Sequence, residues 1–170
     1  MIYMVEMALL DSARRAAWEA WYVAHQHRLL AIPGIRASQR FECIHTAAAP
    51  FVALHEVDGL EVFASDAYRE QAGPSNTGEW QAKMGNWHRN LFRGLDHTPD
   101  VPMDARLVVV ERNCEAALPR DAALRWLDAA GLDQSVRRRG LAVMSAEPAG
   151  LLAGTPGIRV LQPLGPRLVK

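Results

Sequence analysis

The chain has 170 residues, of which 49% are hydrophobic and 22% are charged, and its formal net charge is zero. This length allows one well-buried domain, or one small domain with an appendage, and the composition is typical of a globular protein. The basic residues are scattered apart from the run Arg137–Arg139, which argues against nucleic acid as a partner. No apolar run is long enough to span a bilayer, and no basic leader precedes a cleavage pattern, so we expect a cytoplasmic protein without membrane association.

The N-terminal region predicts a strand followed by an amphipathic helix. Residues 2–9, IYMVEMAL, are β-prone, and Asp11 behind them can cap a helix. Large apolar side chains then recur every three to four residues over residues 18–32, which is the spacing of a helix with one buried face. Pro33 and Gly34 are expected to end this helix.

The following segments complete a known order of elements. Residues 35–45 and 50–57 predict two strands of a hairpin, and residues 58–72 predict a second helix. Helical spacing resumes over residues 79–87, and residues 89–95 can form a fourth strand. The order β-α-β-β-α-β is that of a ferredoxin-like unit with an antiparallel sheet, so the predicted fold class is α+β.

The C-terminal part resembles a degenerate second copy of this unit, beyond a polar, proline-bearing boundary at residues 96–104. RLVVVER resembles a first strand, PRDAALRWLDAAG a first helix and RRRGLAVMSAEP a second strand, and the tail TPGIRVLQPL echoes IPGIRASQRF. A second helix and a fourth strand are not recognisable. We therefore expect two domains, residues 1–95 and a shortened unit at residues 105–170 that packs on the first or at a dimer interface; chance similarity of β-α-β segments is the alternative.

Two histidines lie near the end of the first predicted helix. Residues two apart on a helix are separated by roughly 200° around its axis, so His25 and His27 cannot reach one ligand together. His25 falls on the apolar face with Trp18 and Tyr22, whereas His27 falls toward solvent. His25 is therefore the candidate acid or base.

Strand residues offer partners for His25. Alternation places Glu6, Arg40 and Glu56 on defined strand faces, and His55 on the face opposite Glu56. If the acids face the helix, Glu6 and Glu56, together with Arg40, would orient His25 or hold an anionic group. The alternative is that the acids are edge or interface residues with salt-bridge partners.

Several further side chains belong to segments that are expected to cover the sheet. As pocket walls they would contact substrate, and the alternative is that they fill the core. These candidate substrate-binding residues are Trp21, Tyr22, His55, Tyr68, Trp80, Trp87 and His88. No phosphate loop, nucleophile elbow or clustered metal motif occurs in the sequence, so no metal or cofactor is expected; haem with His25 or His88 as its axial ligand is a minor alternative.

The stretch WYVAHQHRLLAIPGIRASQRF resembles the first helix and second strand of the EthD-like group in the dimeric α/β-barrel superfamily. His25 matches the histidine of that pattern, and FVALHEV, SDAYRE and GEWQAKM are similar to later blocks of longer relatives. The resemblance covers residues 1 to about 95, and it departs from the pattern at His27, where proline is expected, and at His55, where an aromatic residue is expected. It implies a sheet that packs against a partner sheet to form a barrel, hence a homodimer, with a ligand cavity between sheet and helices.

Together these features predict a small-molecule enzyme of catabolic or secondary metabolism. It would act by histidine acid/base chemistry on a carbonyl-bearing or aromatic compound, as a cofactor-free lyase, isomerase or oxygenase. A non-catalytic binding or accessory protein for a hydrophobic metabolite is the alternative. The exposed sheet face would be covered either by a second subunit or by the second half of the same chain.

Overall fold

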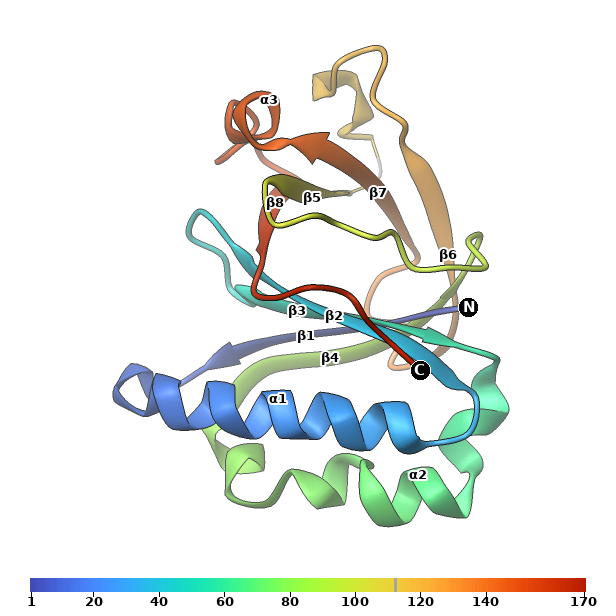
Figure 1. Cartoon of the computed structure of the whole chain (residues 1–170). Helices are drawn as coiled ribbons and strands as arrows, with labels where there is room; N and C mark the ends of the chain where they lie inside the picture. Colours follow the sequence, from blue (N-terminus) through green and yellow to red (C-terminus); the bar gives the residue numbers. More distant parts are fainter. Residues whose placement is uncertain (112) are drawn as a thin grey trace.

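The computed structural model describes residues 1–111 and 113–170, and in this part of the chain eight strands close into an antiparallel barrel with the helices outside it (Figure 1). The strands are β1 (Ile2–Leu9), β2 (Ile35–Cys43), β3 (Phe51–Val57), β4 (Met84–Arg93), β5 (Ala105–Val110), β6 (Arg125–Leu132), β7 (Arg138–Ser145) and β8 (Ile158–Pro163), and a short β9 (Leu168–Val169) pairs with β2. The α-helices are α1 (Arg15–Ala31), α2 (Asp66–Gln71) and α3 (Ala146–Gly150). The 3₁₀ helices are η1 (Ser12–Arg14), η2 (Leu60–Ala64), η3 (Pro74–Lys83) and η4 (Glu115–Ala117).

The first helix begins and ends close to the predicted residues. Before it, the Asp11 carboxylate accepts a hydrogen bond from the Ala13 N–H at 3.1 Å. Behind it, Gly34 adopts a φ of +86°, and a Cβ at this position would lie 2.6 Å from Val62 Cγ2. Both the backbone angle and the close approach therefore favour glycine, and the turn carries the chain directly into β2.

The two halves of the chain have the same strand order. The first half runs β2-β3-β1-β4 and the second runs β6-β7-β5-β8, so both read second, third, first, fourth when strands are counted within each half. Pairing of β4 with β6, for example Phe92 with Ala129, and of β2 with β8, for example Phe41 with Pro163, joins the halves. The second half thus covers the sheet face for which we considered a partner subunit, and the barrel is closed within one chain.

Two sequence-based assignments in the second half of the chain are wrong. The helix expected at residues 119–131 is replaced by a loop and by β6, which pairs with β4 on one side and β7 on the other. Completing the barrel outweighs the helical propensity of this Ala- and Leu-rich segment. The second helix and fourth strand that were not recognised in the second half are present as the short α3 and β8. Within the described chain, the second half lacks only a long first helix that would correspond to α1.

Apolar side chains form three clusters. The barrel interior is filled by residues such as Phe41, Leu54 and Phe92. A second cluster, which includes Trp18, lies between the outer face of β1, β3 and β4 and the layer formed by α1, α2 and η3. The third covers the outer face of the second half beneath α3 and the loop before β6, and it includes Val108. The candidate site lies within the second of these clusters.

Candidate functional site

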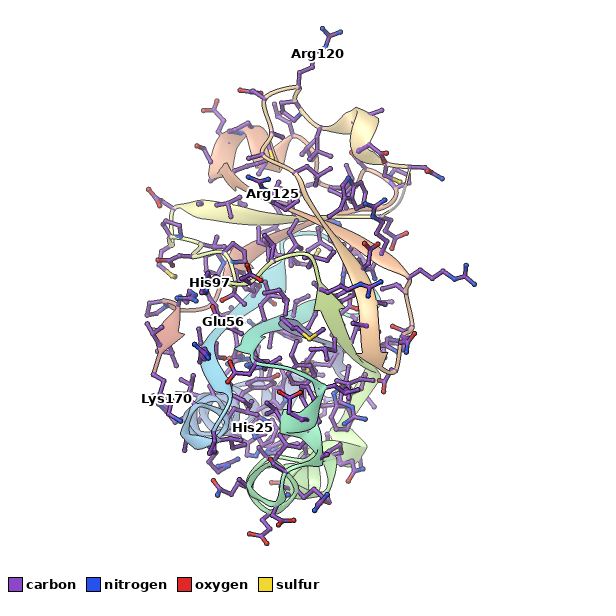
Figure 2. The ribbon with its side chains drawn as sticks, turned by 90° about the vertical axis from the view of Figure 1, so that its right-hand side faces the viewer. His25, Glu56, His97, Arg120, Arg125 and Lys170 are labelled. Carbon is purple, nitrogen blue, oxygen red and sulfur yellow. The ribbon has the colours of Figure 1, made fainter. Side chains whose placement is uncertain are left out.

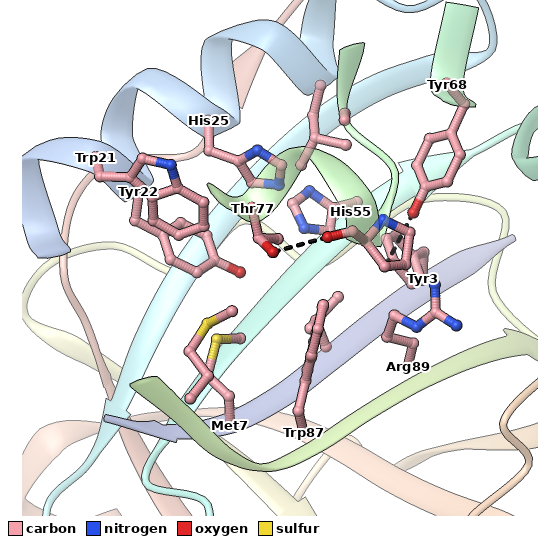
Figure 3. A pocket seen from close by; sticks show the side chains of 15 residues that line it. Tyr3, Met7, Trp21, Tyr22, His25, His55, Tyr68, Thr77, Trp87 and Arg89 are labelled. Carbon is pink, nitrogen blue, oxygen red and sulfur yellow. Dashed lines mark hydrogen bonds between the residues drawn. The ribbon is translucent and has the colours of Figure 1, made fainter. Parts of the chain in front are cut away.

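A pocket opens between the helical layer and the outer face of β1, β3 and β4 (Figure 3). The cavity itself has a volume of about 20 Å³, room for about one water molecule, and the wider empty space of about 390 Å³ includes open solvent at its mouth. A larger ligand therefore enters only if lining side chains move. Most of its wall is apolar or aromatic. Its lining residues are Tyr3, Val5, Met7, Trp21, Tyr22, His25, Leu29, His55, Tyr68, Ala72, Pro74, Thr77, Met84, Trp87 and Arg89.

His25 enters this pocket from the buried face of α1. Its ring stacks on Trp21 with centroids 5.1 Å apart and planes 10° apart, and it meets the Tyr22 ring edge-on at 5.8 Å. Burial, together with the positive charges of Arg28 and Arg40, lowers the pKa of His25 to about 4. The imidazole is therefore neutral at physiological pH and can accept a proton.

His55 projects into the same pocket from β3 in the sheet, whereas His25 comes from α1 in the helical layer (Figure 3). It is fully buried, and neither ring nitrogen has a hydrogen-bond partner in the described chain. Burial, followed by the nearby His25 and Arg40, lowers the pKa of His55 to about 3. A buried polar group without a partner costs about 1–3 kcal/mol, so the presence of a histidine here favours a role toward a polar ligand atom.

Tyrosine hydroxyls supply hydrogen-bond donors around the histidines. The Tyr3 and Tyr68 hydroxyl oxygens lie 3.5 Å apart. Burial holds the pKa of Tyr3 well above its ordinary value, and burial raises the pKa of Tyr22 to about 12, although Arg40 lies 4.1 Å from the Tyr22 ring centroid and opposes that rise. The Tyr3 and Tyr22 hydroxyls therefore keep their protons at neutral pH and can donate to an anionic oxygen.

The structure brings together part of the predicted substrate-binding set. The predicted residues that line the pocket with His25 are Trp21, Tyr22, His55, Tyr68 and Trp87.

The other predicted substrate-binding residues lie elsewhere. Trp80 is buried behind Trp21, with ring centroids 6.0 Å apart, and is outside the lining set. His88 is exposed on β4 and is also outside the lining set. Arg40, which was predicted to orient His25 or hold an anionic group, is also outside the lining set; it lies beneath Tyr22, where it forms an ion pair with Glu19 at 2.8 Å.

The two predicted acids lie on the opposite side of the sheet from His25. Glu6 shares its strand face with Ile2 and Met4, which fill the barrel interior, and it forms ion pairs with Arg139 and Arg159. The expectation that Glu6 orients His25 is therefore not supported by the structure, because alternation turns its side chain into the barrel.

The Glu56 side chain also points away from the helical side of the sheet. Its carboxylate accepts hydrogen bonds from Arg167 at 2.7 Å and from the Thr98 N–H at 3.2 Å, and His97 Nδ1 lies 2.9 Å from it. Figure 2 shows Glu56 and His97 beside each other in the barrel layer, apart from His25 in the helical layer. Both acids therefore have salt-bridge partners away from His25, which was the alternative to a role in orienting it.

Sequence reasoning did not identify Tyr3, Met7, Thr77 or Arg89 as pocket residues. Tyr3 had a usable signal, because alternation places it with Val5 on the face of β1 opposite Glu6. The sequence held no comparable signal for Arg89. The face on which it lies depends on where β4 begins, and the sequence predicted helical spacing up to residue 87.

No protein-family model matches the sequence, and no curated protein matches it. Solved structures that share its fold include the following two. A candidate monooxygenase from Lactobacillus acidophilus NCFM superposes with a TM-score of 0.53 at 10% identity, over 99% of this chain and 98% of that one. An anthrone oxidase-like protein superposes with a TM-score of 0.59 at 7% identity, over 99% of this chain and 92% of that one.

At such low identity these likenesses concern the fold alone, an antiparallel eight-stranded barrel with helices outside it. Membership of the dimeric α/β-barrel superfamily, and of its EthD-like group, stays a prediction. The described helices include none that is long and apolar enough to cross a membrane. In residues 1–111 and 113–170, no three His, Cys, Asp or Glu side chains gather in a way that could hold a metal ion.

Proposed function

We propose that the protein is a small-molecule enzyme of catabolic or secondary metabolism that acts on an aromatic, carbonyl-bearing compound. The supporting observation is that His25 from α1 and His55 from β3 line one largely apolar pocket, and that burial lowers the pKa of each far enough to leave it neutral at pH 7. In this proposal the chain is an EthD-like protein built from two ferredoxin-like units, residues 1–95 and 105–170, of which the first carries the site.

The chemistry follows from these groups. A neutral His25 would accept a proton from carbon adjacent to a carbonyl group, and the resulting enolate oxygen would accept hydrogen bonds from the tyrosine hydroxyls. The apolar walls would exclude water from this anion and strengthen those bonds. His55 would act as a second hydrogen-bonding group for the substrate.

Anthrone is a suitable first substrate, because it is an aromatic ketone with an acidic methylene group and because one structural neighbour is an anthrone oxidase-like protein. With dioxygen as oxidant, anthrone and O₂ give anthraquinone and water. We expect the protein to accelerate this conversion, measured by anthraquinone absorbance and oxygen uptake. His25→Ala should abolish the acceleration, whereas His27→Ala, two residues away and exposed on the same helix, should retain it. No acceleration by the unmodified protein would overturn the substrate class, and full activity of His25→Ala would remove His25 from the mechanism.

A non-catalytic carrier or accessory role is the second candidate. It is favoured by the low pKa of His25, about 4, which gives a base with little driving force for proton transfer. A carrier would release its hydrophobic ligand chemically unchanged, and His25→Ala would alter affinity alone.

We propose no cofactor for this site. Haem would need an axial histidine facing a slot wide enough for a porphyrin. The His25 ring instead stacks on Trp21, in a pocket with about 390 Å³ of empty space including its mouth, and His88 lies outside it. These residues do not fit haem, and reconstitution with haemin should give no Soret band characteristic of histidine ligation.

The homodimer stays a prediction from the resemblance. Sedimentation equilibrium tests it, and the mass of one chain, 18.8 kDa, would contradict it.

A further inference from the structure

The formal charge that lines the pocket is positive. Arg89 is the one formally charged side chain in the described lining, which includes no Asp or Glu. Arg28 Nη2 also lies 3.5 Å from His25 Nδ1, and the charge of Arg40 is felt at both His25 and His55. Glu19 offsets part of the Arg40 charge and Asp133, outside the lining, offsets part of the Arg89 charge, but the described lining itself contains no acid. A buried, largely apolar pocket with this field favours an anionic ligand.

Arg89 is held in place by the turn between β6 and β7. The Arg89 N–H donates to the Asp133 carboxylate at 2.7 Å, and the Asp133 N–H donates to the Arg89 carbonyl oxygen at 2.9 Å. Next to this pair, the Ser135 N–H donates to Asn90 Oδ1 at 2.9 Å, and Asn90 Nδ2 donates to Ser135 Oγ at 2.9 Å. Four hydrogen bonds thus fasten one turn of the second half to β4.

The turn has an unusual backbone that these bonds stabilise. Leu132 and Gln134, on either side of Asp133, have φ values of 63° and 45°, in the left-handed region that side chains other than glycine and asparagine seldom adopt. Such a conformation persists when surrounding contacts determine it, and here those contacts fix the carboxylate of Asp133 beside Arg89.

The guanidinium of Arg89 remains available to a ligand. Its Nη2 lies 3.5 Å from Asp133 Oδ1, which is long for a charge-assisted hydrogen bond, and its remaining N–H groups are free to point elsewhere. The side chain is about a quarter exposed, with the guanidinium 5.9 Å from the Trp87 ring centroid. Figure 3 shows Arg89 at the Tyr3 and Tyr68 end of the pocket, with Trp87 between it and Met7.

We propose that Arg89 binds an anionic oxygen group on an aromatic ligand and that Asp133, from the second half of the chain, is the positioning residue for its guanidinium. The aromatic part would lie against Trp87 and the other ring walls, and its polar end would face the histidines. This inference rests on the proposed function in using the same pocket, but it concerns binding and requires no turnover.

The test compares 2-naphthoate with 2-naphthamide, which have the same ring system and similar size but differ in charge. Affinities are measured by isothermal titration calorimetry at fixed ionic strength. We expect the unmodified protein to bind naphthoate at least tenfold more tightly than naphthamide. Arg89→Gln should remove this preference while changing naphthamide affinity less than twofold, and Arg93→Gln, at an exposed position on the same strand, should keep the preference.

Asp133→Asn tests the positioning role. The expected result is a several-fold loss of preference for naphthoate, with unchanged naphthamide affinity and an unfolding midpoint that shows the protein is folded. A merely structural role would lower both affinities together and leave their ratio unchanged, which would overturn the role of Asp133. Equal binding of the two probes by the unmodified protein would overturn the inference and leave the proposed function standing. Failure of both probes to bind would overturn the inference as well, and anthrone turnover then decides the proposed function separately.

Discussion

Replacing His55 by leucine should stabilise the ligand-free protein. The side chain is fully buried, its two ring nitrogens lack partners in the described chain, and its neighbours include the Tyr3 ring at 5.3 Å. An unpaired buried polar group costs about 1–3 kcal/mol, and leucine has a similar volume, so His55→Leu removes this cost without opening a large cavity. We expect a gain of about 1–2 kcal/mol in the free energy of unfolding. For a chain of this size that raises the unfolding midpoint by about 2–8 °C.

The assay is thermal and urea unfolding followed by tryptophan fluorescence, with Asn90→Leu as the contrasting variant. Asn90 is equally buried, but its amide is bonded to Ser135, so its replacement leaves partners unpaired and should destabilise the protein by about 1–3 kcal/mol. A His55→Leu protein less stable than the original would refute the reasoning, since it would mean that the His55 nitrogens are satisfied. In the proposed function, the same variant should lose affinity for polar aromatic ligands despite its greater stability.

Three further predictions concern pH and a buried acid. Because burial lowers the pKa of His25 to about 4, kcat/KM should stay level from about pH 5 to 8 and fall as the pH drops through about 4; a midpoint near 6.5 would contradict a neutral buried base. His25 and His55 have folded-state pKa values below the ordinary 6.5, so the unfolded chain binds more protons, and urea unfolding should show stability falling as the pH is lowered from about 6.5 toward 4. Burial raises the pKa of Glu56, but its bonds with His97 and the Thr98 N–H outweigh burial and place it below its ordinary value. Glu56→Gln should therefore cost about 1–3 kcal/mol at pH 7, and the difference should vanish as the pH falls through that lowered pKa; a constant difference down to pH 3 would exclude this cause.

The sequence predicted the local features of the first half because they depend on nearby residues. The spacing along α1 separated buried His25 from exposed His27, and alternation along β3 put His55 and Glu56 on opposite faces. Alternation alone could not say which face meets the helices, so Glu56 was placed with the site when it belongs to the barrel layer.

Features that depend on distant pairing were not predictable in this way. The segment that contains Trp126 has the composition of a helix, and it becomes β6 because β4 and β7 each offer an unpaired edge. Arg89 entered the pocket for a similar reason, since the Asp133 turn that holds it comes from the other half of the chain.

Closure of the barrel by β8 against β2 also has a consequence for how the protein is made. Phe41 pairs with Pro163, so β2 is synthesised more than a hundred residues before its partner strand. Until then the nascent chain presents open strand edges, which are the features that promote intermolecular pairing and aggregation. Contacts so distant in sequence also slow folding, so the yield of folded protein should depend on an intact β8.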